Sequence, residues 1–194
     1  MNFLAHLVLS SHDAELQIGN LLGDFVKGRP PETYSEGIRR GIVLHRRIDQ
    51  VTDMHPAVKH LQTLLSLRHG RYAGVVVDVL FDHYLARDWS NLLTIEYGDF
   101  ALQTYSNIKA NLSAMPPKLA TRFSAMVDSR WLDVYKTVPG ILEVFERMQP
   151  RIKNPEYFQD FGLTISEFDE ELSAGFAHLF PDLREAVIQF CAED

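Results

Sequence analysis

The chain has 194 residues, of which 46% are hydrophobic and 23% charged, and its formal net charge at pH 7 is −7. This length and composition predict a single domain over residues 1–194 and exclude an intrinsically disordered chain, because enough apolar residues are present to form a core. The one cysteine, Cys191, excludes an internal disulfide and a thiolate-bound zinc ion. We therefore expect a cytoplasmic protein.

Two apolar stretches need an interpretation. The first, residues 1–10, lacks a basic leader region and contains His6, so we do not interpret it as a signal peptide. The second, residues 73–81, is interrupted by Asp78 and is much shorter than the roughly 20 residues of a membrane-spanning helix. We expect no membrane span and neither a membrane nor a nucleic acid as partner.

Apolar residues recur at three- and four-residue spacing along most of the chain, and no alternating strand pattern appears. The sequence therefore predicts an all-α, single-domain multi-helix bundle. The expected helices cover residues 2–11, 13–27, 35–54, 57–68, 71–96, 99–112, 118–128, 139–149 and 164–192. Prolines mark the breaks, with interruptions expected at Pro155 and Pro181.

Histidines and aspartates concentrate in the first half of the chain at helical spacings. His45 and Asp49 are four residues apart, which places both on one face of a helix. Asp78 and Asp82 repeat this spacing, and His83 follows directly. If these two helices face each other, they form a cluster of imidazoles and carboxylates.

Asp78 and Asp82 lie among valine, leucine and phenylalanine residues, where an unpaired carboxylate is costly. A cation must therefore be near. One alternative is a structural ion pair with Arg71 or Arg87, and the other is a divalent metal ion. Imidazole and carboxylate ligands without thiolate suit Mn²⁺, Fe²⁺ or Mg²⁺ and do not exclude Zn²⁺.

Asp24 is expected near a helix C-terminus, where the helix dipole disfavours negative charge, so Lys27 or a metal ion must compensate it. Gly19 and Gly23 each cost helix stability, which indicates close packing against another helix or a ligand. His6 lies on an apolar helix, where a histidine is more often a hydrogen-bonded core residue than a ligand.

Several kinds of chemistry are excluded by the absence of their motifs. The chain has no Gly-x-Ser-x-Gly turn for a nucleophilic serine and no phosphate-binding loop of the Walker type. Four further histidines lack a carboxylate at ligand spacing and are expected at the surface or in helix caps: His12, His60, His69 and His178. Metal-assisted hydrolysis remains.

Taken in order, these residues resemble the acyl carrier protein phosphodiesterase family, which is distantly related to the HD-type metal phosphohydrolases. The resemblance runs nearly from end to end. Its motifs are MNFLAHL at residues 1–7, GNLLGDFVKG at 19–28, GIVLHRRID at 41–49, TDMHP at 52–56 and DHYLARDW at 82–89. Two departures are Val51, where an aromatic residue is expected, and the order Asp82-His83 in place of His-Asp.

The resemblance implies an all-helical fold and Mn²⁺-dependent hydrolysis, with Mg²⁺ or Fe²⁺ as alternative ions. The implied substrate is holo acyl carrier protein, in which a phosphodiester joins 4′-phosphopantetheine to a serine. Apo carrier protein and 4′-phosphopantetheine would be the products.

We expect the metal ion to act as a Lewis acid and to lower the pKa of a bound water. Its expected ligands are imidazoles and carboxylates: His45, Asp82 and His83 first, then His6, Asp49 and Asp78 as further ligands or supporting residues. Asp24 is expected to be a ligand or the general base, and His6 is also a candidate catalytic residue. Lys27 and Arg46 would stabilise the charge that develops on the phosphate.

Charge is unevenly distributed, because residues 151–194 hold three basic and ten acidic residues and so carry the whole net charge of −7. An acidic partner would therefore dock on the first 150 residues, where Arg39, Arg40 and Arg47 are expected at the outer surface. Two other functions stay open. One is an HD-type phosphohydrolase for a small nucleotide or phosphoester, and the other is a helical binding module with a structural metal site.

Overall fold

The computed structural model describes residues 2–193, and no strand occurs among them. The prediction of an all-α fold is confirmed. Three helices form the N-terminal part of the chain: α1 (Phe3–Leu9), α2 (Ala14–Leu22) and α3 (Glu36–Met54). The predicted second helix, residues 13–27, ends earlier than expected, because the chain tightens after Leu22 into the 3₁₀ turn η1 (Gly23–Phe25).

Side chains next to these helices define where they begin. The Asp13 carboxylate accepts the backbone N–H of Leu16 at the start of α2, and the Ser35 hydroxyl accepts that of Ile38 at the start of α3. Each bond satisfies one of the donors that the first turn of a helix leaves unpaired. The sequence thus fixes the start of α3 to within one residue of the prediction.

Helices α2 and α3 cross at two glycines. A Cβ atom on Gly19 would lie 2.0 Å from the carbonyl oxygen of Ile38 and 2.7 Å from the Cα of Gly41. No real Cβ atom fits at such distances, so the two backbones touch. The close packing predicted for Gly19 is confirmed, with α3 as the neighbour.

The rest of the chain continues as helices joined by short 3₁₀ turns. Their bounds are α4 (Pro56–His69), η2 (Gly70–Tyr72), α5 (Ala73–Arg87), α6 (Trp89–Leu92), α7 (Tyr97–Ala110), η3 (Leu112–Ala114), α8 (Pro117–Asp128), η4 (Trp131–Lys136), α9 (Val138–Met148), η5 (Gln149–Arg151), η6 (Pro155–Tyr157), α10 (Phe161–Glu167) and α11 (Asp169–Ala192).

Two predicted elements are wrong in detail. Residues 71–96 do not form one helix, because α5 ends at Arg87 and the Trp89 indole N–H donates to the Ile95 carbonyl oxygen, which folds the chain back. The predicted helix over residues 164–192 is divided at Phe168, between α10 and α11, whereas Pro181 does not interrupt α11, which runs through it. Its neighbours Phe180 and Leu183 are buried, and their packing holds the helix across the missing backbone donor.

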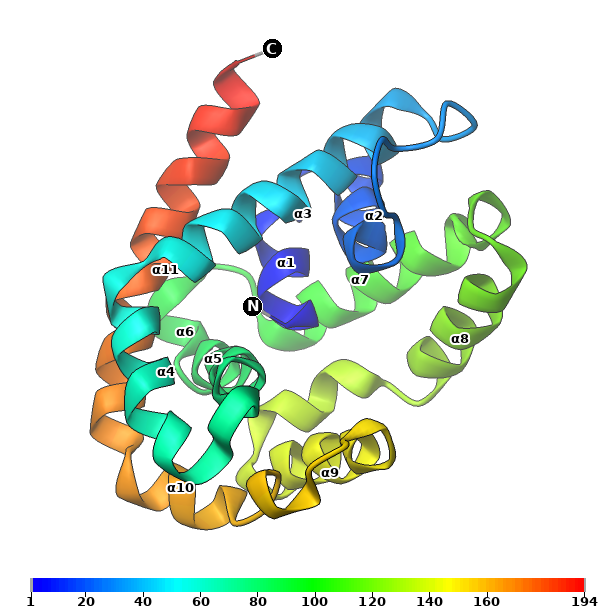
Figure 1. Ribbon diagram of the computed structural model, residues 1–194. Helices are drawn as coiled ribbons and strands as arrows, with labels where there is room; N and C mark the ends of the chain where they lie inside the picture. Colours follow the sequence, from blue (N-terminus) through cyan, green and yellow to red (C-terminus); the bar gives the residue numbers. More distant parts are fainter. Residues whose placement is uncertain (1, 194) are drawn as a thin grey trace.

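Figure 1 shows α1 near the centre of the molecule, with α3 and α4 along one side, α11 outside them, and α7, α8 and α9 on the opposite side. Leu4, Ala5 and Leu7 of α1 are fully buried. A short central helix therefore carries His6 into the interior. Across residues 2–193, every helix is too short or too polar to span a bilayer.

Candidate metal centre

Three side chains with metal-binding atoms converge where α1 faces α3. His6 Nε2 lies 3.2 Å from Asp49 Oδ1, and His45 Nε2 lies 3.1 Å from Asp49 Oδ2. One donor atom from each residue falls within 4.8 Å of the other two. The imidazole rings of His6 and His45 stack, with centroids 4.0 Å apart and planes 19° apart. The spacing of His45 and Asp49 thus places both on the inner face of α3, as predicted.

Asn20 fixes which nitrogen of His6 carries the proton. The Asn20 amide nitrogen donates to the His6 backbone carbonyl oxygen at 2.8 Å, so the amide oxygen must face the other way. That oxygen lies 2.8 Å from His6 Nδ1 and can only accept. Nδ1 therefore holds the proton, and Nε2 of the neutral ring presents a lone pair.

The lone pair of His6 Nε2 is the feature that fits a cation. Burial lowers the pKa of His6 to about 4, against the opposing effect of Asp49, so the ring is neutral at pH 7. Nε2 is buried and has no hydrogen-bond partner, although Asp49 lies 3.2 Å away. A lone pair beside a carboxylate is repulsive unless a cation binds both. These residues therefore fit a divalent metal ion with mixed imidazole and carboxylate ligands.

Asp24 completes the candidate site from η1, with Oδ1 3.3 Å from His45 Nε2. The hydrogen bond to His45 lowers the pKa of Asp24, which keeps this carboxylate ionised. Burial lowers the pKa of His45, but its hydrogen bonds to Asp24 and Asp49 prevail and raise it to about 9. Burial raises the pKa of Asp49, but the hydrogen bond from His45 holds it well below its usual range. Two carboxylates thus surround two imidazoles.

Asp82 and His83 lie outside this group. Asp82 is fully buried, and its two carboxylate oxygens accept the backbone N–H groups of Leu4 at 2.7 Å and Ala5 at 3.1 Å. It therefore caps the N-terminus of α1, and burial raises its pKa to about 7. His83 Nδ1 lies 2.8 Å from the Tyr135 carbonyl oxygen. Both residues thus make other contacts. Metal ligation by Asp82 and His83 stays a prediction.

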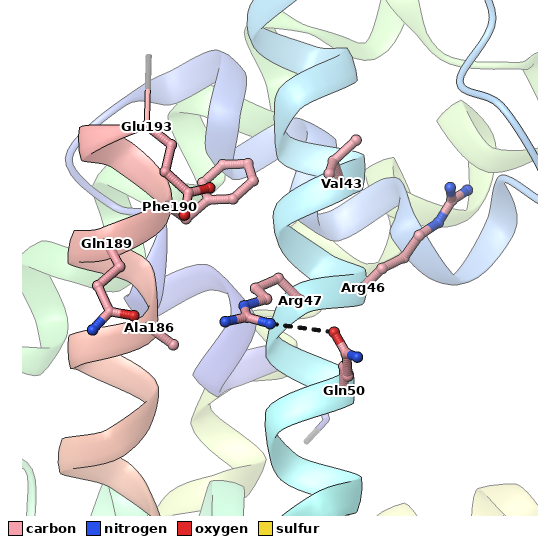
Figure 2. A pocket seen from close by; sticks show the side chains of 8 residues that line it. All are labelled: Val43, Arg46, Arg47, Gln50, Ala186, Gln189, Phe190 and Glu193. Carbon is pink, nitrogen blue, oxygen red and sulfur yellow. Dashed lines mark hydrogen bonds between the residues drawn. The ribbon is translucent and has the colours of Figure 1, made fainter.

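The other three sequence candidates lie around the site. Burial raises the pKa of Asp78 on α5. Lys27 is exposed, and the Arg46 guanidinium donates to the carbonyl oxygens of Val26 at 2.9 Å and Gly28 at 2.6 Å. Arg46 thus holds the segment that follows η1. Figure 2 shows that Arg46 points away from α11 whereas Arg47 points toward it.

Two residues were not singled out correctly from the sequence. Asn20, which orients His6, is a buried amide within an otherwise apolar run of α2, and this pattern is the signal that marks it. His69, expected at the surface, is fully buried, with Nε2 2.7 Å from the Thr164 hydroxyl. The expectation for His69 is wrong because tertiary contacts from α10 satisfy its ring.

The fold and this site define an all-helical protein with an imidazole–carboxylate centre suited to a divalent cation. A family model described as acyl carrier protein phosphodiesterase matches residues 1–183. The chain therefore belongs to the acyl carrier protein phosphodiesterase family.

Three curated relatives illustrate the similarity, and each is named acyl carrier protein phosphodiesterase. The protein of Pectobacterium atrosepticum is 39% identical over 156 residues, covering 78% of this chain and 79% of the relative. That of Yersinia pestis is 38% identical over 152 residues, with the same shares covered. That of Escherichia coli O6:K15:H31 is 33% identical over 191 residues, covering 95% and 96%. No solved structure matches the chain, so the likeness to HD-type enzymes stays a prediction.

Proposed function

We propose that this protein is a metal-dependent hydrolase that cleaves the phosphodiester between 4′-phosphopantetheine and a serine of holo acyl carrier protein. The observation that supports metal dependence most directly is the neutral His6 ring, whose buried Nε2 lone pair lies 3.2 Å from the Asp49 carboxylate. Membership of the family, whose curated relatives carry the name of this activity, supports the substrate.

His6, His45 and Asp49 would hold the ion, with Asp24 beside them, and His45 would release its Nε2 proton on binding. A divalent cation bound there, most simply Mn²⁺, would supply Lewis-acid chemistry and lower the pKa of a bound water. Asn20 keeps the His6 proton on Nδ1, so that Nε2 is available as a ligand. Asp24 is 59% exposed at its side chain and faces the outside of the site. It is thus the carboxylate best placed to meet a substrate or an attacking water.

The charge of the substrate indicates which surface of this protein it would contact. Carrier proteins of this class are acidic, so the arginines that line the surface grooves of α3, Arg39 and Arg47, would support the encounter, whereas the acidic residues 151–194 would not. A single cysteine is consistent with the cytoplasmic location that we expect.

The proposed function is tested by incubating the purified protein with holo carrier protein and Mn²⁺ and measuring intact mass. We expect loss of phosphopantetheine, inhibition by EDTA, and loss of activity in His45→Ala. His60→Ala on α4 is the matched control, because His60 is exposed. Conversion that proceeds fully in EDTA would exclude the metal, and no conversion in any condition would exclude the substrate.

A further inference from the structure

A cavity of about 480 Å³ opens beside Asp24, on the side of η1 that faces α8, η4 and α9. This volume falls in the range of roughly 300–1,000 Å³ that is usual for small-molecule sites. Most of its wall is apolar or aromatic, with Phe25, Trp131, Val144 and Met148 among the lining residues. Asp24 belongs both to this wall and to the metal centre. One end of the cavity therefore lies at the metal centre.

The charges that line the cavity favour an anion. Among residues 2–193, Asp24 is the one acidic residue that lines it, against Arg122, Arg147 and Arg151. Arg147 pairs with Glu143 at 3.1 Å, whereas neither Arg122 nor Arg151 pairs with a carboxylate within residues 2–193. Two arginines without an ion-pair partner at one cavity attract a negatively charged ligand group.

Arg122 interacts electrostatically with Asp24 of the metal centre. Its guanidinium lies over the ring of Phe25, 5.2 Å from the centroid, and Phe25 follows Asp24 directly in η1. Burial and the positive charge of Arg151 lower the pKa of Arg122, whereas the charge of Asp24 acts in the opposite direction. Arg122 is thus within electrostatic reach of both Asp24 and Arg151.

Trp131 adds a large aromatic surface to the wall of the cavity. The residue is 5% exposed, and its indole nitrogen is closed off from the cavity as well as from solvent. The ring therefore contributes apolar contact area, which suits an aliphatic segment of a ligand.

We propose that this cavity binds the phosphopantetheine arm, with the phosphate at the end formed by Asp24 and Arg122 and the aliphatic chain along the wall that includes Trp131 and Val144. The arm has the matching chemistry: an anionic phosphate at one end, a branched aliphatic segment next to it, and two amides further along. This inference rests on the proposed function and extends it, because it assigns the residues that recognise the arm.

The test uses two variants that keep the metal ligands. Arg122→Gln removes the charge near the phosphate, and Val144→Trp fills the apolar part of the cavity. Matched controls are Arg184→Gln, an exposed arginine on α11, and Leu102→Trp, an exposed leucine on α7. Calorimetry of the Mn²⁺-loaded protein measures binding of 4′-phosphopantetheine and of pantetheine, and KM is measured with holo carrier protein.

We expect Arg122→Gln to weaken 4′-phosphopantetheine about tenfold or more and to leave pantetheine unchanged, since a charge-assisted hydrogen bond to the phosphate is lost. Val144→Trp should abolish binding of both molecules and raise KM. The same arm occurs in coenzyme A, and we expect holo carrier protein to displace 4′-phosphopantetheine at lower concentration than coenzyme A does. The reverse order would overturn the assignment to the carrier protein.

The outcomes separate this inference from the proposed function. If the protein converts holo carrier protein while binding and KM are unchanged in both variants, the cavity proposal is wrong and the hydrolysis stands. If binding of 4′-phosphopantetheine depends on both Arg122 and Val144 in a protein that converts no holo carrier protein, the cavity stands and the proposed function is wrong. Circular dichroism of each variant excludes misfolding as the cause.

Discussion

The imidazole of His45 occupies the space that a side chain on Gly23 would need. A Cβ atom on Gly23 would lie 2.1 Å from His45 Cγ and 2.4 Å from both Cβ and Cδ2 of the same residue. Gly23 has φ −53°, a conformation open to any residue, so its backbone does not require glycine. The absence of a side chain at Gly23 is what allows α3 to bring His45 against η1 and Asp24.

Gly23→Ala should therefore weaken metal binding by displacing the His45 ring. Alanine favours helical backbone more than glycine does, so a loss cannot be attributed to local propensity. We expect the Mn²⁺ affinity, measured by calorimetry, to fall at least about tenfold, as happens when a ligand loses its orientation. Gly98→Ala on α7 is the control, because nothing lies within 4 Å of the Cβ position there. Equal affinity in both variants would contradict this account of Gly23.

Asn20→Leu should reduce metal affinity through His6 without touching the ion. The substitution removes the acceptor that keeps the His6 proton on Nδ1, so the ring loses its fixed tautomer. A loss of roughly 10- to 100-fold in Mn²⁺ affinity is expected. Gln17→Leu, on the same helix and equally buried, removes hydrogen bonds to Leu7 and Thr104 but none to His6. It should destabilise the fold and leave the affinity unchanged.

Asp82→Asn separates capping from ligation. An amide can accept only one of the two N–H groups from Leu4 and Ala5 and turns its own donor toward the other, so unfolding should require about 1–3 kcal/mol less. Urea denaturation measures this. Because the structure places Asp82 under α1, we expect Mn²⁺ affinity to fall less than in Asp49→Asn. A greater loss in Asp82→Asn would restore Asp82 to the ligand set predicted from the sequence.

His69 should make stability depend on pH. Burial lowers the pKa of His69, so below about pH 6.5 the unfolded chain binds a proton that the folded protein resists. The free energy of unfolding should therefore decrease as the pH falls, by up to about 1.4 kcal/mol per pH unit from this residue. Urea denaturation between about pH 7.5 and pH 5 tests this. His69→Leu should lower stability at neutral pH but flatten its pH dependence, and an unchanged slope would contradict the role of His69.

Charge reversal on α3 tests docking of the acidic carrier protein. Arg39 lines a shallow groove with Arg29, and Arg47 lines its continuation toward α11. Arg39→Glu combined with Arg47→Glu should raise KM several-fold and leave kcat nearly unchanged, because surface charges mainly affect the encounter. The wild-type rate at low substrate should also decrease with salt, which screens charges beyond roughly 8 Å. Indifference to both changes would place recognition on the cavity and on apolar contacts alone.

The sequence predicted the parts of the fold and site that depend on local spacing. His45 and Asp49 share a helical face because they are four residues apart, and Ser35 starts α3 where its capping pattern indicates. His6 was undervalued because its partners, Asn20 and Asp49, come from other helices.

Long-range contacts explain the remaining errors. Asp82 has ligand-like spacing with Asp78, but its carboxylate binds the start of α1, a contact that spans 78 residues of chain. Proline lacks the backbone donor that a helix needs, yet the burial of its neighbours on α11 keeps the helix continuous through Pro181. Both outcomes depend on which side chains the tertiary fold buries, and the local sequence does not specify that.

The position of the metal-binding residues along the chain has a consequence for the order in which the protein is built. His6, Asp24, His45 and Asp49 all lie within the first 49 residues, on α1, η1 and α3, and these elements follow one another closely in sequence. Contacts between neighbouring segments form early, because little loop entropy is lost. The cavity walls at Trp131 and Val144 are synthesised some 80 residues later. During synthesis on the ribosome, the metal-binding side chains can thus come together before the residues that form the cavity for the phosphopantetheine arm have been added to the chain.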